Sequence, residues 1–362
     1  MPITKIAASG FSDAVNFRNI VINGDMTVSQ RGTSTASITS GDYYTVDRFR
    51  TFINNTAGTW TQSQSTTVPT GEGFVNSLKM DCTTAKGSLS AGDILSIRQA
   101  FEGQSLQYLK KGTSSAESLT ASFWVRSNKT GTYIVELEDR DNTRYVSQSY
   151  TISSADTWEK KTVTFPGDTS GAFSNDDGES LRFNFWLAAG TNYSSGTLGT
   201  TWHTTQANRA VGIVNLGDST DNEWYVTGVQ LEAGDTASEF EFIPPDINLQ
   251  RCQRYYFRRQ GDSGDQRSLS NGMASETNRY RGAFIFPITM RTGPTVTEAA
   301  VETLRPGAVN NAVSLGSLLD SSPNAATVQL DTDSGTPYTQ GHALILRTEN
   351  SASAFVAFDA EL

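Results

Sequence analysis

Two tryptophans in the middle of the sequence stand on segments that alternate apolar and polar residues. Every second residue of 119–126 and of 181–187 is apolar, so the residues between them, Trp124 and Trp186 included, are predicted to face away from a core. Residues 133–138 alternate in a similar way. If the three segments are strands of one sheet, its outer face carries these aromatic, charged and amide side chains: Trp124, Arg126, Glu136, Glu138, Arg182, Asn184 and Trp186.

Such a face has the chemistry that a sugar requires. A hexose has an apolar C–H face that can stack on an indole ring, and its hydroxyl groups need planar polar partners. The alternative is that this face packs against another layer of strands or against a neighbouring subunit. The prediction is a ligand-binding site made of six residues: Trp124, Arg126, Glu136, Arg182, Asn184 and Trp186.

The sequence offers little for catalysis. Its two histidines, His203 and His342, are far apart, so neither a Ser-His-Asp triad nor a cluster of metal-binding histidines is indicated. No phosphate loop or dinucleotide motif is present. The carboxylates within 136–141 and 176–179 could supply the acid and the nucleophile of a glycosidase, but such clusters are typical of solvated strand ends and loops. We predict no catalytic residue and expect a protein that is not an enzyme.

Composition restricts the partners. The 362 residues carry a net charge of −10, with an isoelectric point near 4.8, so no basic stripe is available for nucleic acid. No apolar run approaches the ~20 residues of a membrane span, so membrane insertion is not expected. The N-terminus lacks the pattern of a secretory signal, which predicts synthesis in a cytoplasm. Cys82 and Cys252 are far apart, and their separation favours free thiols.

Turn-rich composition and short alternating segments predict an all-β chain with three parts. Residues 1–18 hold too few apolar side chains for a core and are predicted to be an anchoring segment. Residues 19–243 are predicted to form a jelly-roll β-sandwich, with a β-bulge at 227–228 and one helical turn at 106–111. All six tryptophans precede the Pro244-Pro245 pair, and residues 246–362 are predicted to form a smaller β-sandwich.

Several motifs also resemble a family of virion proteins of tailed phages, which includes tail fibres and related appendages, notably of marine phages. The motifs that carry this resemblance are NGDMTVSQRGTS, YTVDRF, FWVRSNKTGTY, ADTWEKKTVTFPGDTSG, FWLAAGTNY and WYVTGVQLEAGDTASEFE. The central part resembles carbohydrate-binding modules of the jelly-roll type. RCQRYY and FPITMRTGPTVT resemble the start of the C-terminal head domain of such fibres. The motifs are specific as a set, although each alone is weak.

The resemblance implies a non-enzymatic virion appendage that binds host cell-surface polysaccharide. It further implies a homotrimer that attaches to other virion proteins through residues 1–18. The chain lacks the coiled coil and β-helix repeats of long fibres, so a purely structural head fibre or capsid decoration protein stays open. A glycan-degrading enzyme is a remote alternative. In related modules the first and last strands are neighbours, which would bring Asp25 near Glu232 and predicts a calcium site there.

Overall fold

The structure is a computed structural model that describes most of the chain. The described residues are 17–55, 57–261, 266–305, 307, 309–333 and 337–362. The predicted anchor, residues 1–18, therefore lies outside the described residues except for Phe17 and Arg18. In the described part no helix is long and apolar enough to cross a membrane.

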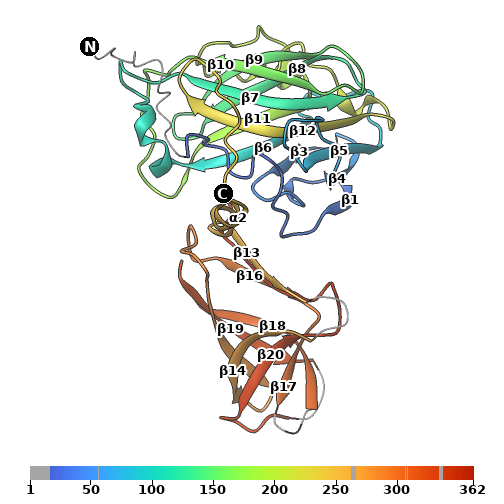
Figure 1. Cartoon of the computed structure of the whole chain (residues 1–362), viewed down its shortest axis with the longest axis vertical. Coiled ribbons are helices and arrows are strands. Elements are labelled where there is room, and N and C mark those ends of the chain that lie inside the picture. The colour runs from blue at the N-terminus through green and yellow to red at the C-terminus, as the bar shows by residue number, and fades with distance from the viewer. Residues whose placement is uncertain (1–16, 56, 262–265, 306, 308, 334–336) are drawn as a thin grey trace, which may run out of the picture. The chain divides into compact units, whose positions relative to one another are not determined.

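The chain forms two compact units (Figure 1). Unit 1 holds most of the chain up to Ile243, and unit 2 runs from Pro244 to Leu362. Two short segments from the first part of the sequence, Val28–Gly32 and Val46–Arg48, also belong to unit 2. The sequence analysis assigned both segments to the jelly roll.

Unit 1 contains two six-stranded antiparallel sheets. Sheet A has the order β1 (Ser34–Ile38), β4 (Thr59–Ser65), β5 (Ser77–Thr84), β12 (Glu223–Ala233), β7 (Leu119–Ser127) and β10 (Glu159–Phe165). Sheet B has the order β2 (Asp42–Tyr43), β3 (Arg50–Asn54), β6 (Ile94–Glu102), β11 (Glu179–Ala189), β8 (Gly131–Asp139) and β9 (Arg144–Ile152). Helical elements occur only as short turns in this unit as described: η2 (Gly103–Ser105), η3 (Gln107–Leu109), α1 (Thr191–Ser194), η4 (Gln206–Asn208) and η5 (Leu216–Asp218).

The two sheets pack face to face around an aromatic core. Phe123 of sheet A and Phe185 of sheet B meet edge-on, with their ring centroids 5.0 Å apart. Trp224 of sheet A lies 5.7 Å from the Phe185 ring. All three side chains are buried, as the alternation of their strands predicts. The all-β fold and the jelly-roll sandwich of unit 1 are thus confirmed.

The premise that residues 119–126 and 133–138 are strands of one sheet is wrong. β7 pairs with β10 and β12, whereas β8 pairs with β9 and β11, so these consecutive strands lie in different sheets. The predicted bulge is confirmed, because the register of β12 against β7 shifts between Thr227 and Gln230. Gly228 adopts a φ of +60° there, a conformation that glycine tolerates best.

Unit 2 begins with the helix α2 (Pro245–Gln253), whose first residue is one of the two prolines that marked the predicted boundary. A three-stranded sheet follows, with the order β13 (Tyr256–Gln260), β21 (Phe355–Asp359) and β16 (Thr295–Ala299). The remaining strands close a barrel in the order β14 (Ser268–Glu276), β15 (Arg279–Ile285), β19 (Ala325–Thr332), β18 (Val309–Ser321), β17 (Val301–Arg305) and β20 (Ala343–Thr348).

The barrel differs from the smaller sandwich expected for this part of the chain. β14 pairs with both β15 and β20, so the sheet returns to itself and has no free edges. Its core is apolar and contains the buried rings of Tyr280, Phe284 and Phe358. Both cysteines, Cys82 in unit 1 and Cys252 in unit 2, are buried and free, as predicted.

Candidate functional site

The structure separates the six predicted binding residues into two groups. Trp124 and Arg126 lie on β7 in sheet A, whereas Glu136, Arg182, Asn184 and Trp186 lie on β8 and β11 in sheet B. The inner faces of the two sheets pack against each other, so their outer faces point in opposite directions. The six side chains therefore cannot form one site, and the premise that their three strands share a sheet is wrong.

Three members of the sheet-B group, Arg182, Asn184 and Trp186, line a hollow of about 270 Å³ on the outer face of that sheet. We call it the sheet-B pocket. Its lining combines aromatic rings, amides and an excess of arginine over glutamate: Phe52, Asn54, Ile94, Ser96, Arg98, Glu138, Arg140, Arg182, Asn184, Trp186, Tyr193, Gln206 and Arg209. The strands β3, β6, β8 and β11 supply most of these residues. Tyr193, Gln206 and Arg209 come from the long connection between β11 and β12.

Glu136 is fully buried and anchors a hydrogen-bond network beside the pocket. Arg209 donates to both of its carboxylate oxygens, at 2.7 Å from Nε and 2.8 Å from Nη2. The indole of Trp186 and the amide of Asn184 each donate to Glu136 Oε2 at 3.1 Å. Burial raises the pKa of Glu136, and the Arg209 guanidinium opposes that shift. Glu136 therefore positions its neighbours and does not itself line the pocket.

Glu138 links three guanidinium groups at the pocket wall. Arg140 Nη1 donates to Glu138 at 2.7 Å, Arg209 Nη2 donates at 3.1 Å, and Arg182 lies 3.6 Å away. Burial acts to raise the pKa of Glu138, but these three positive charges outweigh it and hold the pKa below its usual value. Arg182 also forms an ion pair with Glu179. The wall is thus a paired network of charges held in fixed positions.

Trp186 is not the exposed stacking platform that the sequence suggested. Only 2% of it is exposed, and it belongs to a small apolar cluster with Ile94 and Ile134. The rings that remain half-buried at this pocket are those of Phe52 and Tyr193. Sequence reasoning missed both. Phe52 alternates with core residues on β3, which is a usable signal, whereas Tyr193 follows a strand end and carries no periodic pattern.

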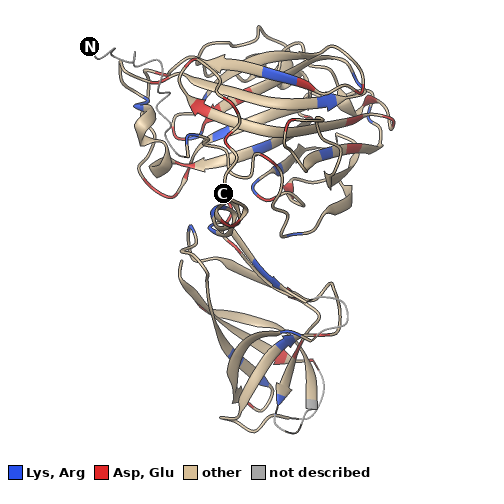
Figure 2. Ribbon diagram, in the orientation of Figure 1, with Lys and Arg blue, Asp and Glu red and all other residues tan. Residues whose placement is uncertain are grey.

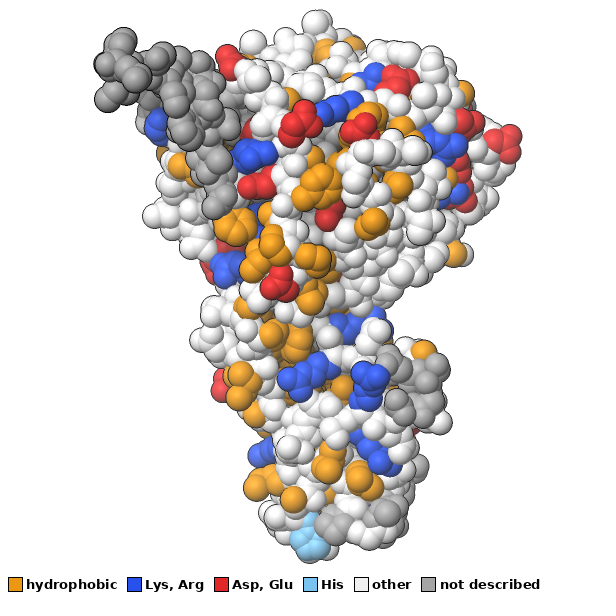
Figure 3. Space-filling model, in the orientation of Figure 1, with side chains coloured by type: hydrophobic (Ala, Val, Ile, Leu, Met, Phe, Trp, Pro, Cys, Tyr) orange, Lys and Arg blue, Asp and Glu red, His pale blue; other side chains and the backbone are white. Residues whose placement is uncertain are grey.

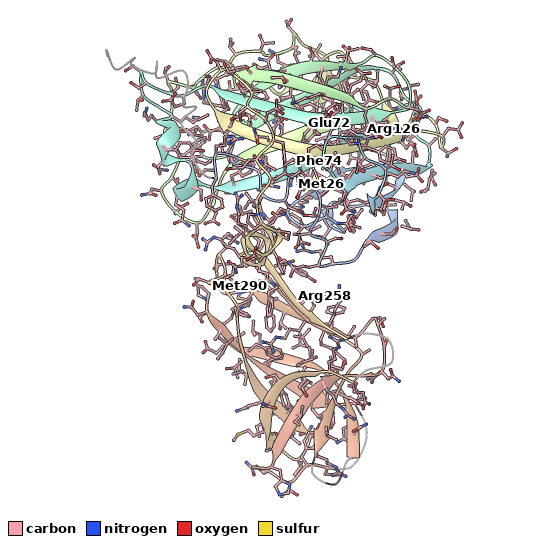
Figure 4. The ribbon with its side chains drawn as sticks, viewed as in Figure 1. Met26, Glu72, Phe74, Arg126, Arg258 and Met290 are labelled. Carbon is pink, nitrogen blue, oxygen red and sulfur yellow. The ribbon has the colours of Figure 1, made fainter. Side chains whose placement is uncertain are left out.

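A second hollow, of about 260 Å³, lies on the outer face of sheet A. We call it the aromatic pocket; its lining residues are Glu72, Phe74, Ser122, Trp124, Lys160, Gly228, Glu239, Phe240 and Phe242. The three phenylalanine rings pack on one another with centroids 4.8–5.2 Å apart. Figure 4 marks Phe74 and Glu72 of this pocket. On the face of unit 1 seen in Figure 3, hydrophobic side chains are exposed among acidic and basic ones.

Arg126 lines neither pocket. Its guanidinium pairs with Asp156 at 2.9 Å and with Glu223 at 3.2 Å, and it lies 5.0 Å from the centroid of the Tyr225 ring. Figure 2 shows acidic and basic residues intermixed over the strands of unit 1. The partners of Arg126 satisfy its charge, so the arrangement is that of an ordinary surface ion pair.

The structure shows the surroundings of the residues predicted to bind calcium, Asp25 and Glu232. The chain near Asp25 does run beside the last strand, since Ile20 N donates to Leu231 O at 2.8 Å. However, the Glu232 carboxylate already accepts hydrogen bonds from Gln230 and from the backbone and hydroxyl of Ser238. The described residues contain no group of three or more His, Cys, Asp or Glu side chains arranged for a metal ion. The calcium site stays an untested prediction.

Comparison with solved structures gives distant likenesses to this chain. No family model and no curated protein matches the chain. A domain of tailspike protein 4 of bacteriophage CBA120 aligns at 14% identity and a TM-score of 0.31, over 60% of this chain and 21% of the tailspike chain. The carbohydrate-binding module TmCBM61, solved with β-1,4-galactotriose, aligns at 8% identity and a TM-score of 0.28, over 60% of this chain and 99% of the module.

A family 11 carbohydrate-binding module from Clostridium thermocellum, solved with a mixed-linked tetrasaccharide, aligns at 12% identity and a TM-score of 0.27. That alignment covers 57% of this chain and 98% of the module. Identities and TM-scores at this level carry no argument about function. The jelly-roll sandwich described above rests on the pairing of the chain's own strands.

Proposed function

We propose that the chain is a non-catalytic glycan-binding protein and that the sheet-B pocket is its sugar site. The observation that carries the proposal is a small hollow on a rigid sheet face that places half-buried rings beside fixed planar polar groups. Phe52 and Tyr193 supply the rings, and Arg182 and Asn184 are the planar polar groups that line the hollow beside them. Aromatic and planar polar groups together match the apolar face and the hydroxyl groups of a sugar.

The hydrogen bonds that hold Glu136 and Glu138 support sugar binding rather than sugar hydrolysis. A glycosidase needs one carboxyl group that can give up a proton and a second that can attack or activate water. Glu138 is held by Arg140 and Arg209, and Glu136 is buried against Arg209 and Trp186. Both carboxylates are therefore engaged by arginine side chains, an arrangement that favours a role in positioning over one in proton transfer.

A glycan array followed by titration calorimetry on the best ligand tests this assignment. Tyr193→Ala should weaken binding roughly 2- to 13-fold, because it removes one stacking ring. Tyr108→Ala removes a ring that is 51% exposed and lines neither pocket, so it should leave the affinity unchanged. If Trp124→Ala weakens binding and Tyr193→Ala does not, the sugar site is the aromatic pocket instead.

We further propose that this protein is a virion appendage that presents the pocket to host polysaccharide. This part rests on the sequence motifs that resemble phage appendage proteins. In this proposal residues 1–18 attach the chain to other virion proteins, and three copies assemble. Immunogold labelling of virions would locate the subunit, and a sedimenting monomer at micromolar concentration would contradict the trimer.

A further inference from the structure

Arg98 is the arginine of the sheet-B pocket that, among the described residues, has no carboxylate within ion-pair distance. It is only 7% exposed, yet it lines the hollow. In the part of the chain that the structure describes, its guanidinium makes no hydrogen bond or ion pair. It lies over the ring of Phe52, with Cζ 4.0 Å from the ring centroid. A buried cation that reaches such a hollow without a carboxylate in direct contact is unusual, because desolvating a charge is costly.

The surroundings of Arg98 make its positive charge less favourable still. On the neighbouring strand β3 its cross-strand partner is Arg50, and Arg182 lies on β11 on its other side. Burial, followed by repulsion from Arg182 and Arg50, lowers the pKa of Arg98 to about 9, and the more distant charges of Glu179 and Glu138 offset this shift only in part. The other three arginines of the pocket each have a glutamate partner: Arg140 with Glu138, Arg182 with Glu179, and Arg209 with Glu136.

Resting on the glycan-binding function proposed above, we infer that the sheet-B pocket selects a sugar bearing a carboxylate and that Arg98 receives this group. A planar guanidinium can donate two parallel hydrogen bonds to a carboxylate, which adds geometric selectivity to the charge. A neutral sugar would leave the buried guanidinium unpaired. The hollow is smaller than the ~300–1,000 Å³ of sites for drug-sized ligands, so it accepts one ring of a longer chain.

The test uses the full-length protein and matched pairs of oligosaccharides. Each pair consists of a uronic acid oligomer (galacturonate, glucuronate or mannuronate) and its carboxyl-reduced neutral form, which differ only in the charged group. We expect an acidic member to bind about 10- to 100-fold more tightly than its neutral partner, the effect of one hydrogen bond to a charged group. Inorganic sulfate and phosphate serve as separate probes for a site that binds any small anion.

Two variants remove one positive charge each. Arg98→Met keeps an unbranched apolar side chain over Phe52 and should abolish the preference for the acidic member. It should also keep or raise the melting temperature of the protein without sugar, because it removes a poorly solvated cation beside Arg50 and Arg182. An arginine with a purely structural role would give the opposite change in melting temperature. Arg281→Met, on the barrel of unit 2, is the charge-matched control and should preserve the preference.

The outcomes separate this inference from the proposed function. If neutral members bind as tightly as acidic ones, glycan binding stands and the inference is overturned. If Arg98→Met retains the preference for acidic members, Arg98 does not receive the carboxylate. An affinity for sulfate or phosphate equal to that for the acidic sugar would indicate an adventitious ion only. That result would also overturn the inference. If neither acidic nor neutral sugars bind, the proposed function fails together with the inference.

Discussion

At the scale of single residues, the two tryptophans predicted to act together differ in how much of each indole is covered. Trp186 is almost fully buried, its indole nitrogen donates to Glu136, and its ring lies 5.7 Å from that of Tyr193. Trp124 is half-buried and lines the aromatic pocket on the other sheet. Trp186 therefore stabilises the fold beneath a pocket, whereas Trp124 keeps part of its ring available to solvent or to a partner.

We expect Trp186→Ala to destabilise unit 1 by about 3–5 kcal/mol, the usual cost of truncating a buried tryptophan. Trp124→Ala should cost less than about half of that, because part of its ring is already exposed. Chemical denaturation of both variants measures the difference. Equal losses of stability would contradict the burial described here.

The sequence predicted the direction of single side chains better than their surroundings. Arg182 and Asn184 do point outward from the sheet, as the parity of their strand requires. Arg98 was missed although it alternates with the buried Leu95, Ile97 and Phe101, because its strand carries no tryptophan that would mark it as part of a sugar-binding face. Arg209 could not be placed at all, since it lies in an irregular connection without any periodic signal.

At the scale of elements, strand alternation identifies the buried face but not the sheet. β7 and β8 both direct one face toward the same core, so their patterns are alike although they belong to opposite sheets. A three-residue connection, 128–130, favours a hairpin in a sequence-based argument. In a sandwich it can instead carry the chain from one sheet to the other. Whether the connection forms a hairpin or crosses between the sheets depends on which distant strands pair with β7 and β8. The sequence of the connection itself does not indicate those strands.

The connections at one end of the sandwich are held by a buried carboxylate. Asp168, which follows β10, accepts hydrogen bonds from Arg144 Nε at 2.7 Å and Nη2 at 3.1 Å, where Arg144 begins β9. Lys111 Nζ lies 3.1 Å from Asp168 and 2.5 Å from Asp139. Burial opposes the charged form of Asp168, but the hydrogen bonds from Arg144 and Ser170 and the charge of Lys111 prevail, so its pKa is lowered.

The lowered pKa of Asp168 predicts how the stability of unit 1 depends on pH. Asp168 binds a proton more readily in the unfolded chain, so its contribution is complete above the unfolded pKa of about 4 and is lost as the pH falls through the lower folded pKa. Melting curves of the wild type and of Asp168→Asn should therefore differ by a constant amount above about pH 5 and converge below about pH 4. A difference that stays constant down to pH 2.5 would contradict this role.

At the scale of the whole molecule, unit 2 is not one continuous stretch of sequence. The tryptophan distribution and the Pro-Pro pair placed a boundary between 243 and 246, and the units divide at Ile243 and Pro244. No local pattern could show that 28–32 and 46–48 also belong to unit 2, because their role depends on partners more than 300 residues away. Arg31, from the first of these segments, pairs with Asp359 at 2.9 Å and approaches Glu361 at 3.5 Å.

Glu361 and Arg48 form the most buried ion pair of this cluster. The Arg48 side chain is 0% exposed and that of Glu361 is 5% exposed. The guanidinium of Arg48 also lies over the ring of Tyr255, with Cζ 3.4 Å from the centroid. Burial raises the pKa of Glu361 despite the two arginines that face it. Because both charges have left water, each depends on its partner far more than a surface ion pair does.

Glu361→Ala should consequently destabilise unit 2 by about 3–5 kcal/mol, because it leaves the buried Arg48 charge without its carboxylate. The matched control is Asp331→Ala, which removes a carboxylate from the solvent-accessible pair with Arg279 on the barrel and should cost much less stability. Replacing both buried partners, with Arg48→Met and Glu361→Leu, should recover most of the lost stability, since no unpaired charge then remains. Calorimetry of the full chain follows the transition of unit 2 in each variant. Equal effects of Glu361→Ala and Asp331→Ala would show that 28–32 and 46–48 are not held to unit 2 by these charges.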